Sequence, residues 1–185
     1  MRYMFGVLGL LVVLIVAIVL LATRAPGTNP QQGKQATVLA DYANKDAKVE
    51  YKTRGRIVGE ESFRTVRITV TRRERTMDIL SGYEETIKDS KTFPNTDAAY
   101  SVFIKALDKA GFAREKTTTI KDETGICPLG RMYTYDLKEG TDIKTHLWNN
   151  SCTSQGSFSG DGSLIMQLFQ AQIPDYLKTT SGLNL

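Results

Sequence analysis

The alternation of hydrophobic and polar residues divides the chain into three parts. The first contains residues 3–22, which read YMFGVLGLLVVLIVAIVLLA without a charged residue or a proline. As a helix, this run would rise about 1.5 Å per residue and span about 30 Å, close to the thickness of a bilayer's hydrocarbon core. We therefore predict a transmembrane anchor over residues 1–22.

A cleaved signal peptide is the alternative interpretation of the same run. The run is longer than the apolar core of a signal peptide, which has about 7–15 residues. Cleavage after Ala22 would place Leu20 where a small residue is preferred, and cleavage after Ala25 would leave Pro26 as the first residue. These features favour an anchor that stays attached.

The second part is a short linker, residues 23–36, with the sequence TRAPGTNPQQGKQA. Its prolines, glycines and glutamines disfavour a packed element and favour an extended chain. From residue 37 to residue 185, about 150 residues remain, which suffice for one domain with its own core. No internal repeat or second linker interrupts this third part, so we predict a single domain over residues 37–185.

The first half of the domain alternates with a period of two. After a short predicted helix over residues 37–45, residues 48–54 alternate between charged and apolar or hydroxyl side chains, as a strand with one solvated face does. The same alternation starts near residue 63, is interrupted by the arginines around residue 73, and resumes up to residue 83. Residues 63–83 therefore predict a β-hairpin.

Two segments have helical spacing instead. Residues 95–111 predict an amphipathic helix with Asn95 or Thr96 as its N-cap, and Gly111 at its end. Residues 161–172 predict a second helix, which Pro174 stops.

A second hairpin is predicted between these helices, with strands near residues 132–137 and 143–147 and a turn at Gly140. Cys127 and Cys152 lie at nearly equal distances from that turn. The hairpin would therefore bring the two sulfur atoms opposite each other beyond the strand ends, as a disulfide requires. The alternation of the two strands, however, would place Cys127 opposite residue 153 and not opposite Cys152. We therefore also predict a one-residue bulge near Pro128 that absorbs this difference.

The predicted order of strands, helix, strands and helix indicates an α+β domain. We expect an antiparallel sheet built from two hairpin units, two main helices packed on one face of it, and one disulfide. The two cysteines of the chain are consistent with an oxidising compartment. This places the amino terminus in the cytoplasm and the domain outside the cell membrane.

Several short segments resemble a known group of proteins. Cys127-Pro128, the segment LWNNSC that ends at Cys152, the segment GSFSG, and LFQAQIPDY from Leu168 to Tyr176 are similar to uncharacterised, short, membrane-anchored proteins of candidate-phylum bacteria such as Saccharibacteria. The resemblance covers most of the domain and implies a bacterial cell envelope. It implies no activity, cofactor or site residue.

Sequence motifs assign no catalytic residue, metal ligand or cofactor. His146 is the single histidine, and no nucleophile motif or second histidine accompanies it. Two acidic pairs, Glu60-Glu61 and Glu84-Glu85, could serve a hydrolase, but both fall in predicted turns where acids usually face water. The glycine-rich loop before residue 161 lacks the lysine of a phosphate-binding loop.

Charge is concentrated in one region. Residues 52–75 carry eight basic and three acidic residues, a net charge of +5, whereas residues 76–185 carry eleven basic and fourteen acidic residues. Arginine matches phosphate and carboxylate groups well. The candidate anion-binding residues are Arg54, Arg56, Arg64, Arg67, Arg72, Arg73 and Arg75. The alternative is that these arginines bind no partner and only keep a solvated strand from aggregating with other chains.

Together these patterns predict a single-pass, membrane-anchored binding or scaffolding protein of a bacterial envelope. Its expected partners are the membrane and an anionic polymer, lipid headgroups or another envelope protein, contacted through the basic hairpin. One alternative is an envelope hydrolase or transferase with scattered site residues. A second is a pilin-like assembly subunit, although Pro26 and Pro30 would break the continuous helix of a pilin.

Overall fold

The structure is a computed structural model that describes residues 37–120, 123–183 and 185. The predicted anchor, residues 1–22, and the predicted linker, residues 23–36, lie outside the described residues. Among the helices of the described part, none is long and apolar enough to cross a membrane.

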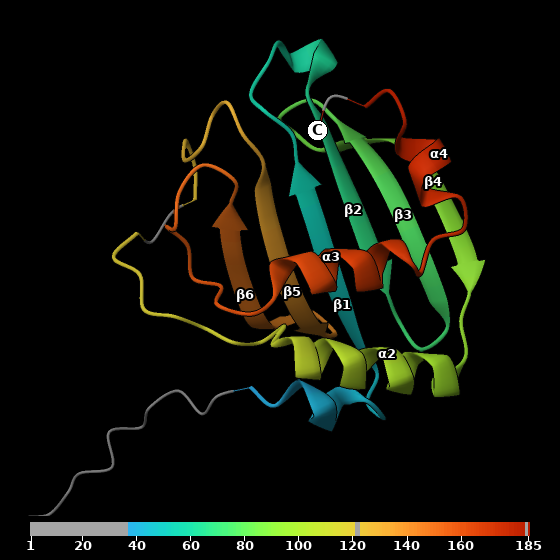
Figure 1. Ribbon diagram of the computed structural model, residues 1–185. Helices are drawn as coiled ribbons and strands as arrows, with labels where there is room; N and C mark the ends of the chain where they lie inside the picture. The colour runs from blue at the N-terminus through green and yellow to red at the C-terminus, as the bar shows by residue number, and fades with distance from the viewer. Residues whose placement is uncertain (1–36, 121–122, 184) are drawn as a thin grey trace, which may run out of the picture. The chain divides into compact units, whose positions relative to one another are not determined.

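The described residues form an α+β fold around one antiparallel sheet of six strands in the order β4-β3-β2-β1-β5-β6 (Figure 1). Its strands are β1 (Ala47–Arg54), β2 (Arg64–Val70), β3 (Glu74–Ser81), β4 (Thr86–Pro94), β5 (Met132–Glu139) and β6 (Asp142–Asn150). The predicted α+β class, both hairpins and the antiparallel sheet are confirmed. The hairpins are not separate units, because β1 pairs with both β2 and β5 and joins them into one sheet.

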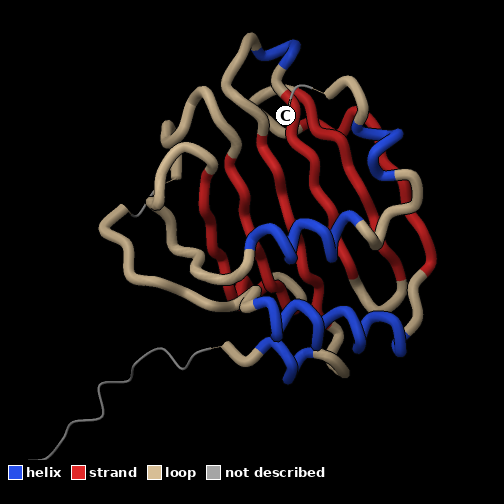
Figure 2. The backbone as a smooth tube through the Cα atoms, viewed as in Figure 1, coloured by secondary structure: helices blue, strands red, loops and turns tan. Residues whose placement is uncertain are grey.

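The helices are α2 (Asp97–Ala110), α3 (Gly162–Gln170) and the short α4 (Tyr176–Thr180), and two 3-10 turns, η1 (Leu39–Tyr42) and η2 (Glu60–Ser62), accompany them. Figure 2 shows α2 and α3 on the same side of the strands. We call this side of the sheet the helix face and the opposite side the open face. The α2 N-cap is Thr96, whose Oγ1 accepts a hydrogen bond from the Ala99 backbone N–H at 3.2 Å. Gly111 ends the helix with φ of 79°, a conformation that glycine adopts without strain.

Three sequence predictions differ from the structure. The predicted helix over residues 37–45 is reduced to η1. Strand β4 was not predicted, because its side chains are mostly exposed and show no apolar alternation. The bulge predicted near Pro128 lies instead between Leu137 and Lys138, where the register of β5 with β6 shifts.

The hydrophobic core lies between the helix face and the two main helices. Its centre is a group of aromatic rings in which Phe169 of α3 contacts Tyr51 of β1 and Phe103 of α2, with ring centroids 5.4 and 5.2 Å apart. Phe112 and Tyr135 extend the group toward β5. Aromatic contacts of this kind combine a large buried area with a preferred geometry, so they fix both helices on the sheet.

The open face carries most of the polar residues of β1, β2 and β5. Glu50 and Asp78 on this face are buried, and each is paired with a neighbour: Lys138 with Glu50 at 3.3 Å and Arg67 with Asp78 at 2.8 Å. The chain between α2 and β5 also reaches this face, where Ile126 packs against a small cluster of Cys127, Met132 and Trp148. Paired charges and this second small cluster therefore replace a helical layer on the open face.

Candidate ligand-binding groove

Three of the seven predicted arginines are used within the domain. Arg67 binds Asp78 through Nε at 3.1 Å and a terminal nitrogen at 2.8 Å. Arg72 binds both carboxylate oxygens of Asp97, at 2.9 and 2.7 Å. Arg64 donates to the Phe63 carbonyl and to Ser81 Oγ. Their charges are engaged by neighbours in the fold.

The other four arginines lie in different places. Arg54 belongs to the open face, whereas Arg75 pairs in register with the core residue Val70 and therefore belongs to the helix face. Arg73 is exposed in the turn between β2 and β3, and Arg56 is exposed in the loop after β1. The structure thus distributes the seven arginines over both faces and does not bring them together in one patch.

Arg56 lies beside a second arginine that the sequence analysis did not single out. It lines a cavity of about 370 Å³ together with Arg131, Tyr133 and the last leucines of the chain, Leu183 and Leu185. Among the residues that the structure describes, neither guanidinium group is in an ion pair. Two unpaired arginines beside one cavity provide a site for an anion, because their planar groups match phosphate and carboxylate oxygens.

A second cavity, of about 340 Å³, adjoins the first along β5. Tyr133 lines both cavities. The other residues that line the second cavity are Tyr51, Tyr135, Asn149, Gly162, Ser163 and Met166. We call the two cavities together the tyrosine–arginine groove. Each has a volume within the range of about 300–1,000 Å³ that is typical of ligand pockets.

The alternation of β5 builds the aromatic side of the groove. Tyr133 and Tyr135 both face the helices, and the Tyr133 ring lies parallel to that of Tyr51, with centroids 6.4 Å apart. Tyr133 is half-buried while Tyr51 and Tyr135 are buried. Tyr133 therefore offers a supported aromatic surface to a ligand, in a position between the two arginines and the second cavity.

Hydrogen-bonding groups lie at the α3 end of the groove. Tyr135 Oη donates to Asn149 Oδ1 at 3.1 Å, which leaves the Asn149 amide hydrogens for other acceptors. Burial raises the pKa of Tyr135 and that of Tyr51 far above the ordinary value. Both phenols thus remain protonated donors at any physiological pH.

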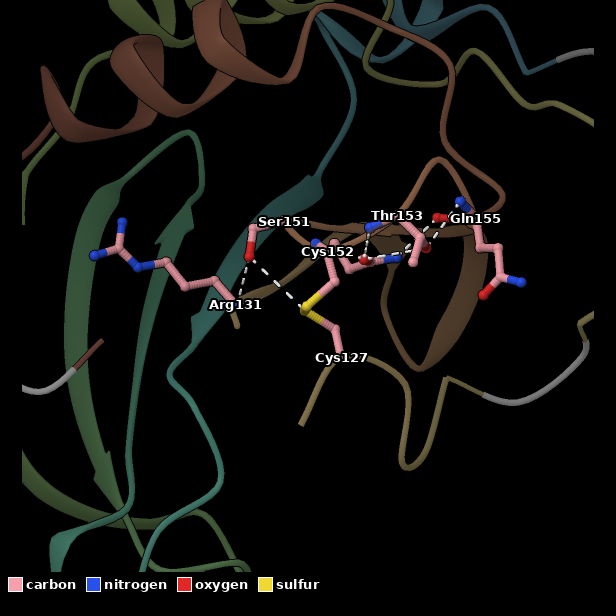
Figure 3. The surroundings of a disulfide bond; sticks show 7 residues. Cys127, Arg131, Ser151, Cys152, Thr153 and Gln155 are labelled. Carbon is pink, nitrogen blue, oxygen red and sulfur yellow. Dashed lines mark hydrogen bonds between the residues drawn. A yellow bond between two sulfur atoms is a disulfide. The ribbon is translucent and has the colours of Figure 1, made fainter. Parts of the chain in front are cut away.

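The disulfide lies next to Gly130, Arg131 and Ser151, which line the first cavity. The bond between Cys127 and Cys152 confirms the predicted pairing, with Cα atoms 5.5 Å apart. Ser151 Oγ accepts a hydrogen bond from the Arg131 backbone N–H at 2.8 Å, and the Arg131 side chain extends away from the disulfide (Figure 3). The disulfide and Ser151 therefore fix the backbone from which Arg131 projects. In the sequence, Arg131 follows Cys127 by four residues. Its position beside the predicted disulfide is the one feature that could have identified it.

His146 lies on the open face between two carboxylates. Its Nδ1 is 2.5 Å from Asp136 Oδ1, and its Nε2 is 3.3 Å from Glu123 Oε2. The hydrogen bond with Asp136, and then that with Glu123, raise the pKa of His146 from 6.5 to about 10. Because the imidazolium donates from both ring nitrogens, His146 has no free nitrogen for use as a general base. Its role in this geometry is to join the loop before β5 to the sheet.

This arrangement predicts a decrease in stability at alkaline pH. The folded pKa is raised, so the contribution of His146 is fully present below the unfolded pKa near 6.5 and is lost as the pH rises through about 10. Urea unfolding between pH 6 and pH 10 should show this decline, and His146→Gln should flatten it. As the only histidine of the chain, His146 also gives a single NMR titration. A midpoint near 6.5 in the folded protein would contradict the prediction.

The acidic residues considered for hydrolysis are either exposed or already paired. Glu60 and Glu61 are exposed in η2, and Glu85 pairs with Lys52 at 3.2 Å. Within the described ranges, no group of three or more histidine, cysteine, aspartate or glutamate residues is placed to hold a metal ion. The geometry of the groove supports binding through arginine, tyrosine and amide groups.

Comparison with known proteins adds no further assignment. No protein-family model matches the chain, and no curated protein sequence matches it. Functional inference therefore rests on the chemistry of the groove.

Proposed function

We propose that this chain is a membrane-anchored, extracytoplasmic binding protein of a bacterial envelope, and that its domain binds an anionic ligand in the tyrosine–arginine groove. Residues 1–22 serve as the anchor and residues 23–36 as the linker. The observation that carries the proposal is that Arg56 and Arg131, both without ion pairs in the described part of the chain, line one cavity with Tyr133. The anionic partner proposed from the sequence is thus assigned to the groove.

The groove favours a ligand that has both an anionic group and a ring. The two guanidinium groups suit a phosphate or a carboxylate. Tyr133 provides an aromatic surface for a sugar ring, and the amide hydrogens of Asn149 provide hydrogen bonds. A phosphorylated or carboxylated sugar unit of an envelope polymer combines these features.

The pilin-like alternative receives no support from the sheet edge. An assembly subunit that adds strands needs an accessible edge, and β4 is such an edge strand. However, β4 contains Lys88 and Lys91 and ends at Pro94. Lysine and proline on an edge strand disfavour pairing with another chain, so the β4 edge gives no support to assembly by strand addition.

Three probes separate the parts of the proposed site. Isothermal titration of the full chain in nonionic detergent should show saturable binding of glucose 1-phosphate, weaker binding of inorganic phosphate, and the weakest binding of glucose. Arg131→Gln should reduce affinity for glucose 1-phosphate about tenfold or more, because a hydrogen bond to a charged group contributes about 1.5–3 kcal/mol. Higher salt should weaken the binding of the two anions, glucose 1-phosphate and phosphate, and leave the binding of glucose unchanged.

Arg73→Gln is the matched control, because it removes the same charge from an exposed turn and Arg73 does not line either cavity of the groove. It should leave the affinity for glucose 1-phosphate within a factor of two of the original. An equal loss in Arg73→Gln and Arg131→Gln would mean that only net charge matters. That result, or the absence of saturable binding by glucose 1-phosphate, would overturn the proposal.

A further inference from the structure

The two cavities of the tyrosine–arginine groove differ in charge. Arg56 and Arg131 line the first cavity, whereas the second is lined by tyrosine, asparagine, glycine, serine and methionine residues, none of which carries a charge. A charged group that leaves water needs a partner of opposite charge. The anionic group of a ligand therefore belongs in the first cavity, and the part of the ligand in the second cavity should be neutral.

Asn149 presents a hydrogen-bond donor to the second cavity. Its Oδ1 accepts from Tyr135 Oη at 3.1 Å, which fixes the orientation of the amide, and its Nδ2 donates to no acceptor in the described part of the chain. Gly162, where α3 begins beside β5 (Figure 1), lies against this amide: a Cβ atom at residue 162 would be 3.4 Å from Asn149 Nδ2 and 3.1 Å from Tyr135 Oη. All three residues line the cavity. The glycine therefore keeps the space beside the donor open to a ligand.

Met166 adds an apolar surface to the same cavity. It lies four residues after Gly162 in α3, on the same side of the helix, and it is half-buried. A ligand group that contacts both Asn149 and Met166 needs a neutral acceptor and a small apolar end. An acetamido group has both, in its carbonyl oxygen and its methyl group. A hydroxyl lacks the apolar end, and a carboxylate carries a charge that the second cavity does not match.

We infer, on the basis of the proposed function, that the ligand of the groove is an N-acetylated amino sugar that carries a phosphate or a carboxylate. Arg56 and Arg131 bind the anionic group, and the sugar ring lies on Tyr133, which lines both cavities. The acetamido oxygen accepts from Asn149 Nδ2, and its methyl group contacts Met166. Asn149 thus distinguishes acetamido sugars from sugars that have a hydroxyl at the same position.

Isothermal titration of the full chain, in a polyoxyethylene detergent that carries no sugar, compares ligands that differ only in the acetamido group. One pair is N-acetylglucosamine 1-phosphate and glucose 1-phosphate, and the other is the corresponding pair of 6-phosphates, because the separation of phosphate and acetamido groups differs between them. In at least one pair the acetamido sugar should bind about tenfold more tightly, since it gains one hydrogen bond and buries one methyl group.

The two possible failures are distinguishable. Saturable binding with equal affinities within both pairs would overturn the assignment of an acetamido sugar and leave the anion site of the groove in place. The absence of saturable binding by all four ligands would overturn the proposed function and this assignment with it.

Asn149→Asp tests the donor itself. The substitution keeps an oxygen that accepts from Tyr135 Oη and replaces the amide donor with a second carboxylate oxygen, so it should remove the tenfold preference. Gln155→Glu is the matched control: it makes the same change from amide to carboxylate at an exposed residue that lines neither cavity, and it should keep the preference. An equal preference in the two variants would contradict the role of Asn149.

Gly162→Ala tests the space beside the donor. Its methyl group would occupy the position next to Asn149 Nδ2 and Tyr135 Oη, so this variant should also lose the preference for the acetamido sugar. Its affinity for inorganic phosphate should stay within a factor of two of the original, because the two arginines of the first cavity are unchanged. A full preference retained in Gly162→Ala would overturn the placement of the acetamido group in the second cavity.

Discussion

Replacing Phe169 with alanine is expected to lower the free energy of unfolding by about 3–5 kcal/mol, the range found for truncation of a buried aromatic residue. Phe169 is fully buried, and its ring contacts those of Tyr51, Phe103 and Phe112. The substitution leaves a void where α3, α2 and β1 meet. Urea unfolding followed by the fluorescence of Trp148, the single tryptophan, measures the loss.

Leu164→Ala provides the comparison for this substitution. Leu164 belongs to the same helix but is 42% exposed, so its truncation should cost about 0.5 kcal/mol or less. Equal costs for the two variants would show that α3 is not fixed by the aromatic group. Because Phe169 supports Tyr51 and Tyr51 stacks on Tyr133, Phe169→Ala should also weaken glucose 1-phosphate binding, whereas Leu164→Ala should not.

Segments with a local pattern could be predicted from the sequence. The spacing of apolar residues and the flanking Thr96 and Gly111 identified α2 within two residues at its amino end and one at its carboxyl end. The alternation in residues 48–54 and 63–83 identified three strands of the sheet. These signals are local, since each depends on side chains a few residues apart and on which of them meet water.

Long-range features of the sheet could not be predicted in the same way. The pairing of β1 with β5 joins residues that are 78 to 92 positions apart, and no turn between them sets the register. Strand β4 has exposed side chains on both faces, so its pairing with β3 is determined by backbone hydrogen bonds and by the hairpin turn. The hydrophobic pattern carries no information on such a strand.

The candidate site shows the same division. The disulfide was predicted because Cys127 and Cys152 flank one local hairpin. The arginines were grouped by their density along the chain, but neighbouring strand residues point to opposite faces, and two of these arginines, Arg67 and Arg72, pair with acidic residues outside the dense region. Arg131 was missed because it lies outside the dense region and is brought near Arg56 by long-range contacts, namely the pairing of β1 with β5 and the hydrogen bond from the Ile57 N–H to the Pro128 carbonyl.

The disulfide links the stability of the domain to the proposed function of the groove. Replacing both Cys127 and Cys152 with serine is expected to lower the free energy of unfolding by about 3 kcal/mol, because the bond closes a loop with a sequence separation of 25 residues. Ser151, which accepts a hydrogen bond from the Arg131 backbone N–H, would then lose the restraint of the neighbouring covalent bond. The double variant should therefore also bind glucose 1-phosphate more weakly at temperatures where it is still folded.

Gly130→Ala tests the same link with both cysteines present. A Cβ atom at residue 130 would lie 2.5 Å from Ser151 Oγ and 2.7 Å from Cys152 Sγ, too close for unchanged packing, so this variant should lose both stability and affinity. In Gly59→Ala the new Cβ would meet only the flexible side chain of Glu61, and neither property should change much. If the double cysteine variant and Gly130→Ala both bind glucose 1-phosphate as the original chain does, the disulfide does not support ligand binding in the groove.

The same bond tests the proposed location of the domain. In intact cells, external protease should remove the domain, and a non-reducing gel should show Cys127 bonded to Cys152, because disulfides persist in oxidising compartments. A domain that is protected until the membrane is opened, with both thiols free, would reverse the proposed topology. The groove would then face the cytoplasm, and its anionic ligand would have to be sought among cytoplasmic sugar phosphates instead of envelope polymers.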